Sequence, residues 1–212
     1  MIASIIFDFD GVIADSVNIK TDAFLDLYSE YPISIQKKVK EYHLEHSGIS
    51  RYKKIYFFQK ELVKSDYSEE IIDKLADSFK RIVLEKVIDS NYISGAYEFL
   101  DVFHQVIDLH IATGTPQDEI EFITKRKNIS HFFKSIHGSP LSKSEIVGNI
   151  IKQYKYDKKD ILFIGDAMAD YIGAKDNSIK FLGRVEKGEH SIFPKEQAVI
   201  NNLNNLEDYI GN

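Results

Sequence analysis

The chain of 212 residues is long enough for one domain with a sizeable insertion, or for two small domains. It contains no cysteine, which excludes a disulfide framework and a thiolate zinc site, and its net charge of -6 argues against a nucleic-acid partner. No apolar run approaches the roughly 20 residues of a membrane helix, and the first residues already read as a strand rather than a signal segment, so we expect a cytoplasmic protein without a membrane partner.

The first predicted strand, residues 4–9, delivers two carboxylates into a glycine turn. Asp8 and Asp10 lie two positions apart, so their side chains share one face of the strand at its end. Open α/β sheets bind ligands at the carboxyl ends of their parallel strands. Two carboxylates this close repel each other unless a cation or a proton intervenes. The pair therefore indicates a metal ion, a carboxylate nucleophile or both, with an ordinary Asp-Gly turn as the simpler alternative.

No strand is predicted from about residue 17 to residue 87. The hydrophobic pattern indicates helices there, and the last of them carries an apolar stripe of helical period. We expect four helices, at residues 17–30, 34–46, 50–63 and 68–87.

The loop between the second and third of these helices contains a candidate substrate-binding residue. Gly48 breaks the helix, and Arg51 follows it closely. An arginine there can bind a carboxylate or a second phosphate bidentately, or it can be a surface residue of the third helix. Four basic side chains nearby are interpreted as residues of packed or solvated faces without a functional role: His43, His46, Lys53 and Lys54.

A strand predicted at residues 106–112 leads into a polar turn. Thr113 and Gly114 follow it, and Thr115 is expected to cap a helix that begins at Pro116. Backbone N–H groups at such a helix start favour a bound anion, although an ordinary helix cap has the same sequence.

Lys143 follows a short strand predicted at residues 135–137. Ser142 and Glu145 form a predicted capping box, which places Lys143 in the first turn of a helix. The helix dipole is positive at that end, so a cation there is unfavourable for stability alone. It indicates a bound anion, with a solvated surface lysine as the alternative.

The strand predicted at residues 160–164 ends in a second acidic cluster. Asp166 lies at the strand end and Asp170 four residues further on, a spacing that brings both carboxylates to one side of a helical turn. Mg²⁺ prefers oxygen ligands and keeps several waters. Asp8, Asp166 and the backbone carbonyl of Asp10 would suit it, whereas helix capping by Asp166 alone would not explain a second acidic strand end.

The alternation of strands and helices predicts an α/β fold with a doubly wound, Rossmann-like parallel sheet. Further strands are expected at residues 179–183 and 198–200. The helical segment reads as an insertion. We expect an α/β core of residues 1–15 and 91–212 and a helical domain of residues 16–90.

Residues 5–16, a strand followed by Asp-x-Asp-Gly-Val-x-x-Asp-Ser, resemble the first motif of the haloacid dehalogenase (HAD) superfamily. The other three motifs of that family are matched in order by Thr113, by Lys143 and by Gly-Asp-x-x-x-Asp at residues 165–170. The resemblance covers essentially the whole chain, and the helical insertion is similar to the C1 cap of that family.

The resemblance implies a phosphatase that works through an aspartyl-phosphate. Asp8 would be the nucleophile, and Asp10 would act first as an acid and then as a base. Because an acid must hold a proton, we expect crowding to raise the pKa of Asp10. Thr113 and the Gly114 amide would bind the phosphoryl oxygens, and Lys143 would neutralise their charge.

The resemblance also implies Mg²⁺ as the cofactor. Its expected ligands are Asp8, Asp10, Asp166 and Asp170, with Asp170 orienting Asp166 or a water rather than binding directly. Lys20 occupies the region where the β-phosphoglucomutase branch of the family commonly has a histidine, which lowers the expectation of mutase activity.

These features predict hydrolysis of a small phosphorylated metabolite, such as phosphoglycolate or a sugar phosphate, with Arg51 binding the substrate from the cap. A monomer or homodimer is expected. The alternatives are a sugar phosphomutase and a non-catalytic protein that binds a phosphorylated ligand on the same fold.

Overall fold

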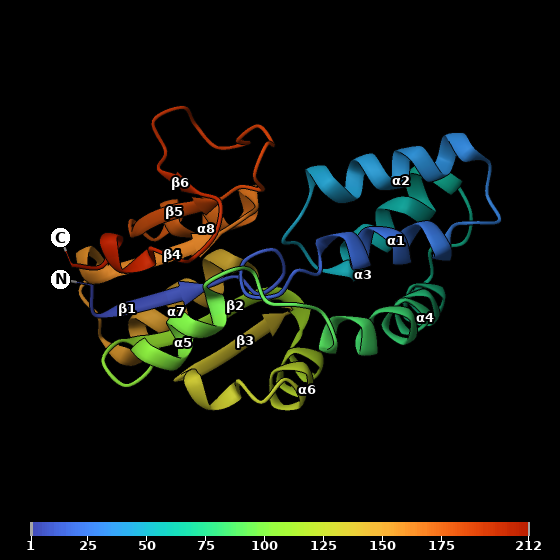
Figure 1. The fold of residues 1–212 in the computed structure, drawn as a ribbon. Helices are drawn as coiled ribbons and strands as arrows, with labels where there is room; N and C mark the ends of the chain where they lie inside the picture. The colour runs from blue at the N-terminus through green and yellow to red at the C-terminus, as the bar shows by residue number, and fades with distance from the viewer. Residues whose placement is uncertain (1, 212) are drawn as a thin grey trace.

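The computed structural model describes residues 2–211, and its centre is a fully parallel sheet (Figure 1). The strands lie in the order β3-β2-β1-β4-β5-β6, and each adjacent pair is parallel. Their bounds are β1 Ser4–Phe7, β2 Asp108–Pro116, β3 Ser135–Ser139, β4 Ile161–Gly165, β5 Lys180–Arg184 and β6 Val199–Ile200. The predicted α/β fold with a doubly wound sheet is confirmed.

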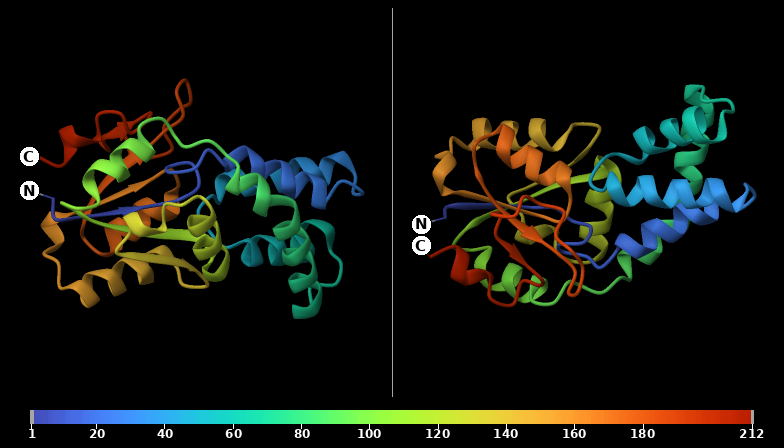
Figure 2. Two further views of the ribbon diagram at one scale, coloured as in Figure 1. Left: turned by 60° about the horizontal axis from the view of Figure 1, so that its bottom comes forward. Right: turned by 90° about the horizontal axis from the view of Figure 1, so that it is seen from above.

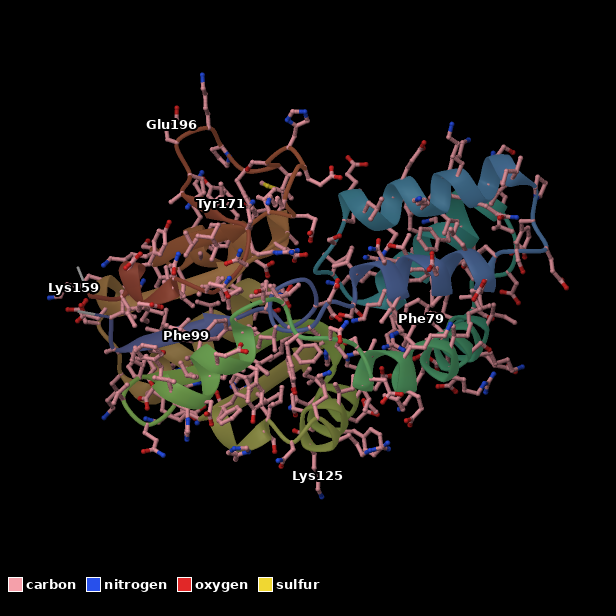
Figure 3. The ribbon with its side chains drawn as sticks, viewed as in Figure 1. Phe79, Phe99, Lys125, Lys159, Tyr171 and Glu196 are labelled. Carbon is pink, nitrogen blue, oxygen red and sulfur yellow. The ribbon has the colours of Figure 1, made fainter. Side chains whose placement is uncertain are left out.

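The central strand β1 is buried on both faces. Ile5 and Phe7 belong to one hydrophobic cluster, and Ile6 belongs to the other. Helix α5 (Ala96–Phe103) packs on the first face, while α7 (Lys143–Tyr154) and α8 (Met168–Asp176) pack on the second. In Figure 3, Phe99 of α5 lies beside β1 on the first face. Helix α6 (Gln117–Arg126) lies against β2 and β3.

The helical insertion, residues 17–88, lies beyond the carboxyl ends of the strands (Figures 1 and 2). It consists of α1 (Val17–Leu27), α2 (Ile33–Glu45), α3 (Arg51–Phe57), a π-helical continuation η1 (Phe58–Val63) and α4 (Glu69–Ile88). The helices predicted in this segment are therefore present, and the second half of the third one is π-helical. Phe24, Phe58 and Phe79 are buried where these helices meet, and the ring centroid of Phe24 lies 5.5 Å from that of Phe58 and 4.2 Å from that of Phe79.

Short 3₁₀ segments complete the fold: η2 Ser130–Phe132, η3 Lys158–Asp160 and η4 Leu206–Tyr209. The two ends of the chain meet at the edge opposite the insertion, where the Ile2 N–H donates to the Ile210 carbonyl at 3.2 Å (Figure 1). Of the helices in residues 2–211, none combines the length and apolar character that a membrane crossing requires.

The prediction of a helix cap at Thr115 is wrong. Strand β2 continues to Pro116 and pairs there with Ser139 of β3, so α6 begins one residue later, at Gln117. The Thr115 side chain makes contacts across the site instead of capping the helix.

Candidate active site

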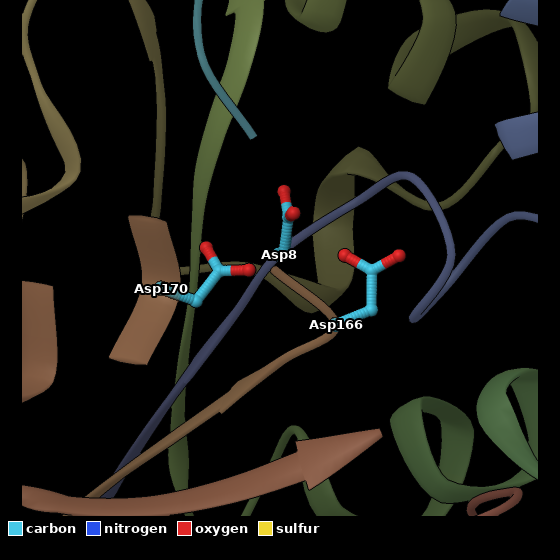
Figure 4. A group of neighbouring side chains, drawn as sticks. All are labelled: Asp8, Asp166 and Asp170. Carbon is cyan, nitrogen blue, oxygen red and sulfur yellow. The ribbon is translucent and has the colours of Figure 1, made fainter. Parts of the chain in front are cut away.

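Three carboxylates, two of them buried and that of Asp166 half-buried, meet where β1 and β4 end (Figure 4). Asp8 follows β1, Asp166 follows β4, and Asp170 lies in the first turn of α8. Each offers an oxygen within 4.8 Å of the others. Strands β1 and β4 flank the point where the strand order reverses, which is the usual ligand crevice of an open parallel sheet.

The backbone after β1 fixes Asp8 and leaves room for Asp166. The Asp8 N–H donates to the Ile164 carbonyl at 2.9 Å, and the Phe9 N–H donates to Asp8 Oδ1 at 2.7 Å. Gly11 has φ +76°, and a Cβ there would lie 2.1 Å from Asp166 Oδ2. The glycine of the first motif is therefore required both by its conformation and by the close approach of the second acidic strand end.

Lys143 lies between the carboxylates. The predicted capping box of Ser142 and Glu145 is present and starts α7 at Lys143. The Lys143 Nζ lies 2.8 Å from Asp8 Oδ1 and 2.5 Å from Asp170 Oδ1. Its side chain is buried, which excludes the surface-lysine alternative.

The ionisation of these acids depends on burial and mutual repulsion. Burial and the charge of Asp170 raise the pKa of Asp8 to about 7, against the opposing effect of Lys143. Burial and the charge of Asp8 raise the pKa of Asp166 well above its usual value. Acids in this condition suit a divalent cation, which relieves the repulsion and takes oxygen ligands. The donor set therefore fits Mg²⁺.

Asp170 is engaged on both oxygens. Its Oδ1 accepts from Lys143, and its Oδ2 accepts from the Ala167 N–H at 3.0 Å. This arrangement suits a residue that orients Lys143 and the loop after β4. Direct metal binding by Asp170 stays a prediction.

Asp10 departs from the expectation that crowding raises its pKa. Burial does act in that direction, but the Lys20 ammonium and hydrogen bonds from Lys20, Ser16 and Thr115 lower the pKa of Asp10 below its usual value. Lys20 Nζ also donates to Thr115 Oγ1 at 2.8 Å. The family resemblance marks Lys20 only as a difference from the mutase branch, and its pairing with Asp10 does not follow from that resemblance. The sequence could have predicted this position of Lys20 from its spacing. Lys20 follows Ser16 by four residues, which places both side chains on one side of the start of α1.

Thr113 and Gly114 lie beside the acids and touch the helical insertion. Thr113 is buried, and its Oγ1 accepts from the Thr115 N–H at 3.2 Å. A Cβ at Gly114 would lie 2.6 Å from the carbonyl oxygen of Gly48. The absence of a side chain at Gly114 thus allows the loop between α2 and α3 to approach the strand ends.

A cavity of about 60 Å³ lies between the strand ends and the helical insertion. The strand ends contribute Asp8, Asp10, Thr113, Gly114 and Asp166 to its lining, and the insertion contributes Lys20, Phe24, His43, Arg51, Lys54 and Phe79. The structure thus brings all the predicted site residues except Lys143 and Asp170 to one cavity. Lys143 contacts both Asp8 and Asp170.

Arg51 is buried rather than at the surface. Its guanidinium forms an ion pair with Glu119 of α6, and its central carbon lies 4.8 Å from the centre of the Phe79 ring. Arg51 therefore joins the insertion to the α/β part of the chain. Substrate binding by Arg51 stays a prediction.

The assignment of Lys54 to a solvated face is wrong. Lys54 is buried and its ammonium group bonds to His43, which is also buried. His43 does pack, against Phe24, but both residues line the cavity. The sequence does contain a signal for this position. Lys54 lies next to Ile55 and four residues before Phe58, and both of these apolar residues are buried on the same side of the helix, so the helical pattern could have predicted that Lys54 is buried as well.

The family model for haloacid dehalogenase-like hydrolases matches residues 5–184, and the chain belongs to this family. The structure is similar to that of β-phosphoglucomutase from Clostridium difficile, with a TM-score of 0.79 and 23% identity over 99% of this chain and 96% of the other. No curated protein matches the sequence.

Two further solved structures share the fold over nearly their whole length. The Bacillus subtilis protein YfnB, bound to magnesium, has a TM-score of 0.75 at 18% identity, covering 100% of this chain and 99% of the other. CbbY from Rhodobacter sphaeroides, in complex with phosphate, has a TM-score of 0.76 at 14% identity, covering 97% and 96%.

Proposed function

We propose that this protein is a magnesium-dependent phosphatase that hydrolyses a small phosphomonoester through an aspartyl-phosphate. The observation that carries the proposal is the placement of Asp8 at the end of the central strand, beside Lys143 and in the wall of the cavity. Family membership supports hydrolysis. The helical insertion, which closes the cavity from the other side, is proposed to act as the cap domain of residues 16–90 over a core of residues 1–15 and 91–212.

Asp8, Asp166 and the Asp10 backbone carbonyl are proposed to hold Mg²⁺, with Asp170 in support. The raised pKa values of Asp8 and Asp166 favour a cation there, and one structural relative was solved with magnesium. When bound, the ion would neutralise phosphate charge and let both carboxylates ionise together.

In the first step an oxygen of Asp8 would attack phosphorus, and the bond from phosphorus to the leaving oxygen would break. Thr113 and the Gly114 amide would hold the phosphoryl oxygens, while Lys143 would offset their charge and orient Asp8. In the second step water would attack the aspartyl-phosphate, give its proton to Asp10 and release phosphate, which restores Asp8 as a carboxylate.

Asp10 must hold a proton to protonate the leaving oxygen in the first step. Its low pKa depends on Lys20, because burial alone would raise it. A substrate phosphate competes for the Lys20 ammonium. We therefore propose that substrate binding draws Lys20 away from Asp10, so that the pKa of Asp10 rises and the carboxyl group can carry the proton.

A sugar phosphomutase is the second candidate. The likeness to β-phosphoglucomutase supports it through the fold. In either case we propose a small phosphorylated metabolite as the partner, and a cytoplasmic monomer or homodimer.

A turnover screen against many small phosphorylated metabolites, with Mg²⁺ and with a chelator, tests the proposal. We expect release of inorganic phosphate from at least one of them, and only with Mg²⁺. Conversion to an isomeric phosphate without net release would favour the mutase. No turnover of any monoester would contradict an enzymatic role.

A further inference from the structure

The helical insertion places a buried cation, Lys54, in the wall of the cavity. Lys54 is 3% exposed, and its Nζ donates to Nδ1 of His43 at 2.8 Å and to the His43 carbonyl at 3.3 Å. Within residues 2–211, no carboxylate oxygen lies within 4.0 Å of this nitrogen. A buried ammonium without a paired anion is unfavourable, and two neutral acceptors replace its lost hydration only in part.

The other cations at the site differ from Lys54 in this respect. Lys20 is paired with Asp10, Arg51 with Glu119, and Lys143 with Asp8 and Asp170. Lys143 and Lys20 are thus committed to the reacting end of the cavity. Lys54 keeps its charge available for a ligand.

His43 adds a second polar group without a complete set of partners. A lysine ammonium can only donate, so its bond to Nδ1 uses the lone pair of that nitrogen, and the ring proton must lie on Nε2. His43 is 5% exposed, and its Nε2 is buried with no hydrogen-bond partner. A buried donor of this kind costs stability unless something accepts from it.

The electrostatics of Lys54 also favours a bound anion. Burial lowers the pKa of Lys54 to about 7, and the nearby charge of Lys20 adds to the effect. A bound anion would oppose both and stabilise the ammonium form. Joining α2 to α3 would explain the Lys54–His43 bond, but a neutral amide donor would do that without burying a charge.

We propose that Lys54, held by His43, binds a second anionic group of the substrate, which is therefore a small phosphomonoester that also carries a carboxylate or a second phosphate. The inference rests on the proposed function and narrows its substrate class. The small cavity favours a short molecule, because both anionic groups must fit between the strand ends and α3.

The test compares substrates that differ only in the second group. Phosphoglycolate is paired with 2-hydroxyethyl phosphate, and 1,3-propanediol bisphosphate with 3-hydroxypropyl phosphate. We expect the wild type to prefer the doubly anionic member of one pair, and that pair shows whether the group is a carboxylate or a phosphate. Lys54→Met should lower kcat/KM for that substrate by about tenfold to a hundredfold, mainly through KM, and at least ten times more than for its neutral partner.

Lys54→Gln should behave in the same way, although it keeps a donor for His43, which separates charge from hydrogen bonding. It also carries the test if Lys54→Met does not fold. Lys53→Met is the matched control, since Lys53 is exposed and lies outside the cavity lining, and it should match the wild type. Equal losses on both members of a pair, or no wild-type preference in either pair, would overturn the inference.

If the wild type hydrolyses none of the four esters, the proposed function fails for this substrate class, and binding decides the inference. The doubly anionic probes should then raise Tm more in the wild type than in Lys54→Gln. Equal shifts would overturn the role of Lys54.

Discussion

At the scale of single residues, Asp8 combines two demands on one carboxylate. It must be ionised to attack phosphorus, yet burial and Asp170 raise its pKa. Asp8→Asn keeps the shape of the side chain and removes the proposed nucleophile. We expect turnover to fall by at least about 10³-fold with the fold retained, as for other covalent nucleophiles.

Steady-state turnover of purified variants measures this effect. Asp15→Asn is the matched control, because Asp15 is exposed in the same motif, and it should keep wild-type turnover. Substantial residual activity in Asp8→Asn, with contaminating phosphatases excluded, would show that the reaction does not pass through Asp8.

The residues that the sequence predicts well are those whose position follows from local pattern. Asp8 and Asp166 directly follow apolar strands, and Lys143 lies within a capping box, so strand or helix geometry alone places them. Lys20 and Lys54 follow no strand end or helix cap, and their only signal in the sequence is their helical spacing from Ser16 and from Ile55 and Phe58. Each is a lysine within a helix, and most such lysines are solvated, so their inward position depends on how the helices of the insertion pack.

At the scale of elements, Arg51 and Lys80 of the insertion meet two acids in the first turn of α6. Arg51 pairs with Glu119, and Lys80 lies 3.0 Å from Asp118 and 3.7 Å from Glu119. The Arg51 pair is buried, so losing either partner leaves an uncompensated charge. These contacts hold the insertion over the strand ends.

We therefore expect Arg51→Ala and Glu119→Gln to lower kcat/KM in parallel on anionic and neutral esters, and to lower Tm by several degrees. Lys74→Ala, which removes an exposed pair with Glu70 within α4, is the control and should change neither. A loss in Arg51→Ala confined to doubly anionic esters, and absent in Glu119→Gln, would instead support substrate binding by Arg51.

The opposite end of β2 contains a buried histidine whose protonation opposes folding. Tyr156 donates its hydroxyl proton to Asp108 at 2.6 Å, so its oxygen accepts from His110 Nε2 at 3.0 Å, while Ser135 lies 2.6 Å from Nδ1. Burial lowers the pKa of His110 to about 4, below its value near 6.5 in an unfolded chain. Between these values the unfolded state binds more protons, so the free energy of unfolding should fall as the pH falls.

His110→Gln should remove this contribution, which amounts to up to about 3 kcal/mol over the whole range and to about 2 kcal/mol between pH 7 and pH 5. Urea unfolding at pH 7 and pH 5 measures it, with the exposed His190→Gln as the control. His43, whose pKa is also lowered by burial, should keep part of the slope in the variant. If the free energy of unfolding depends on pH in His110→Gln as it does in the wild type, His110 does not cause that dependence.

At the scale of the whole molecule, metal binding should couple the two halves of the sheet. Asp8 and Asp166 belong to strands on either side of the reversal of strand order. Mg²⁺ at a hundred times its Kd should stabilise the fold by about 2.7 kcal/mol, which raises Tm by about 5–10 °C in a chain of this size. Chelator should abolish turnover, and Ca²⁺ should restore it poorly because it favours larger, looser coordination.

Thermal unfolding with and without Mg²⁺ checks this prediction. Asp166→Asn should lose the shift, while Glu196→Gln, at the surface in Figure 3, should keep it. Full activity in chelator would contradict a metal requirement, and a Tm shift that survives in Asp166→Asn would place the ion elsewhere.

The place of β1 in the sheet also has a consequence for synthesis on the ribosome. Ser4 pairs with Asp108 on one side and with Ile161 on the other, so the first strand to be made must wait for most of the chain before both neighbours exist. The insertion that follows it is built from helices that contact each other over shorter separations, and such local contacts form sooner. We expect the insertion to be folded while Ile5, Ile6 and Phe7 are still uncovered, so the strand that leads to Asp8 is made first and enclosed late.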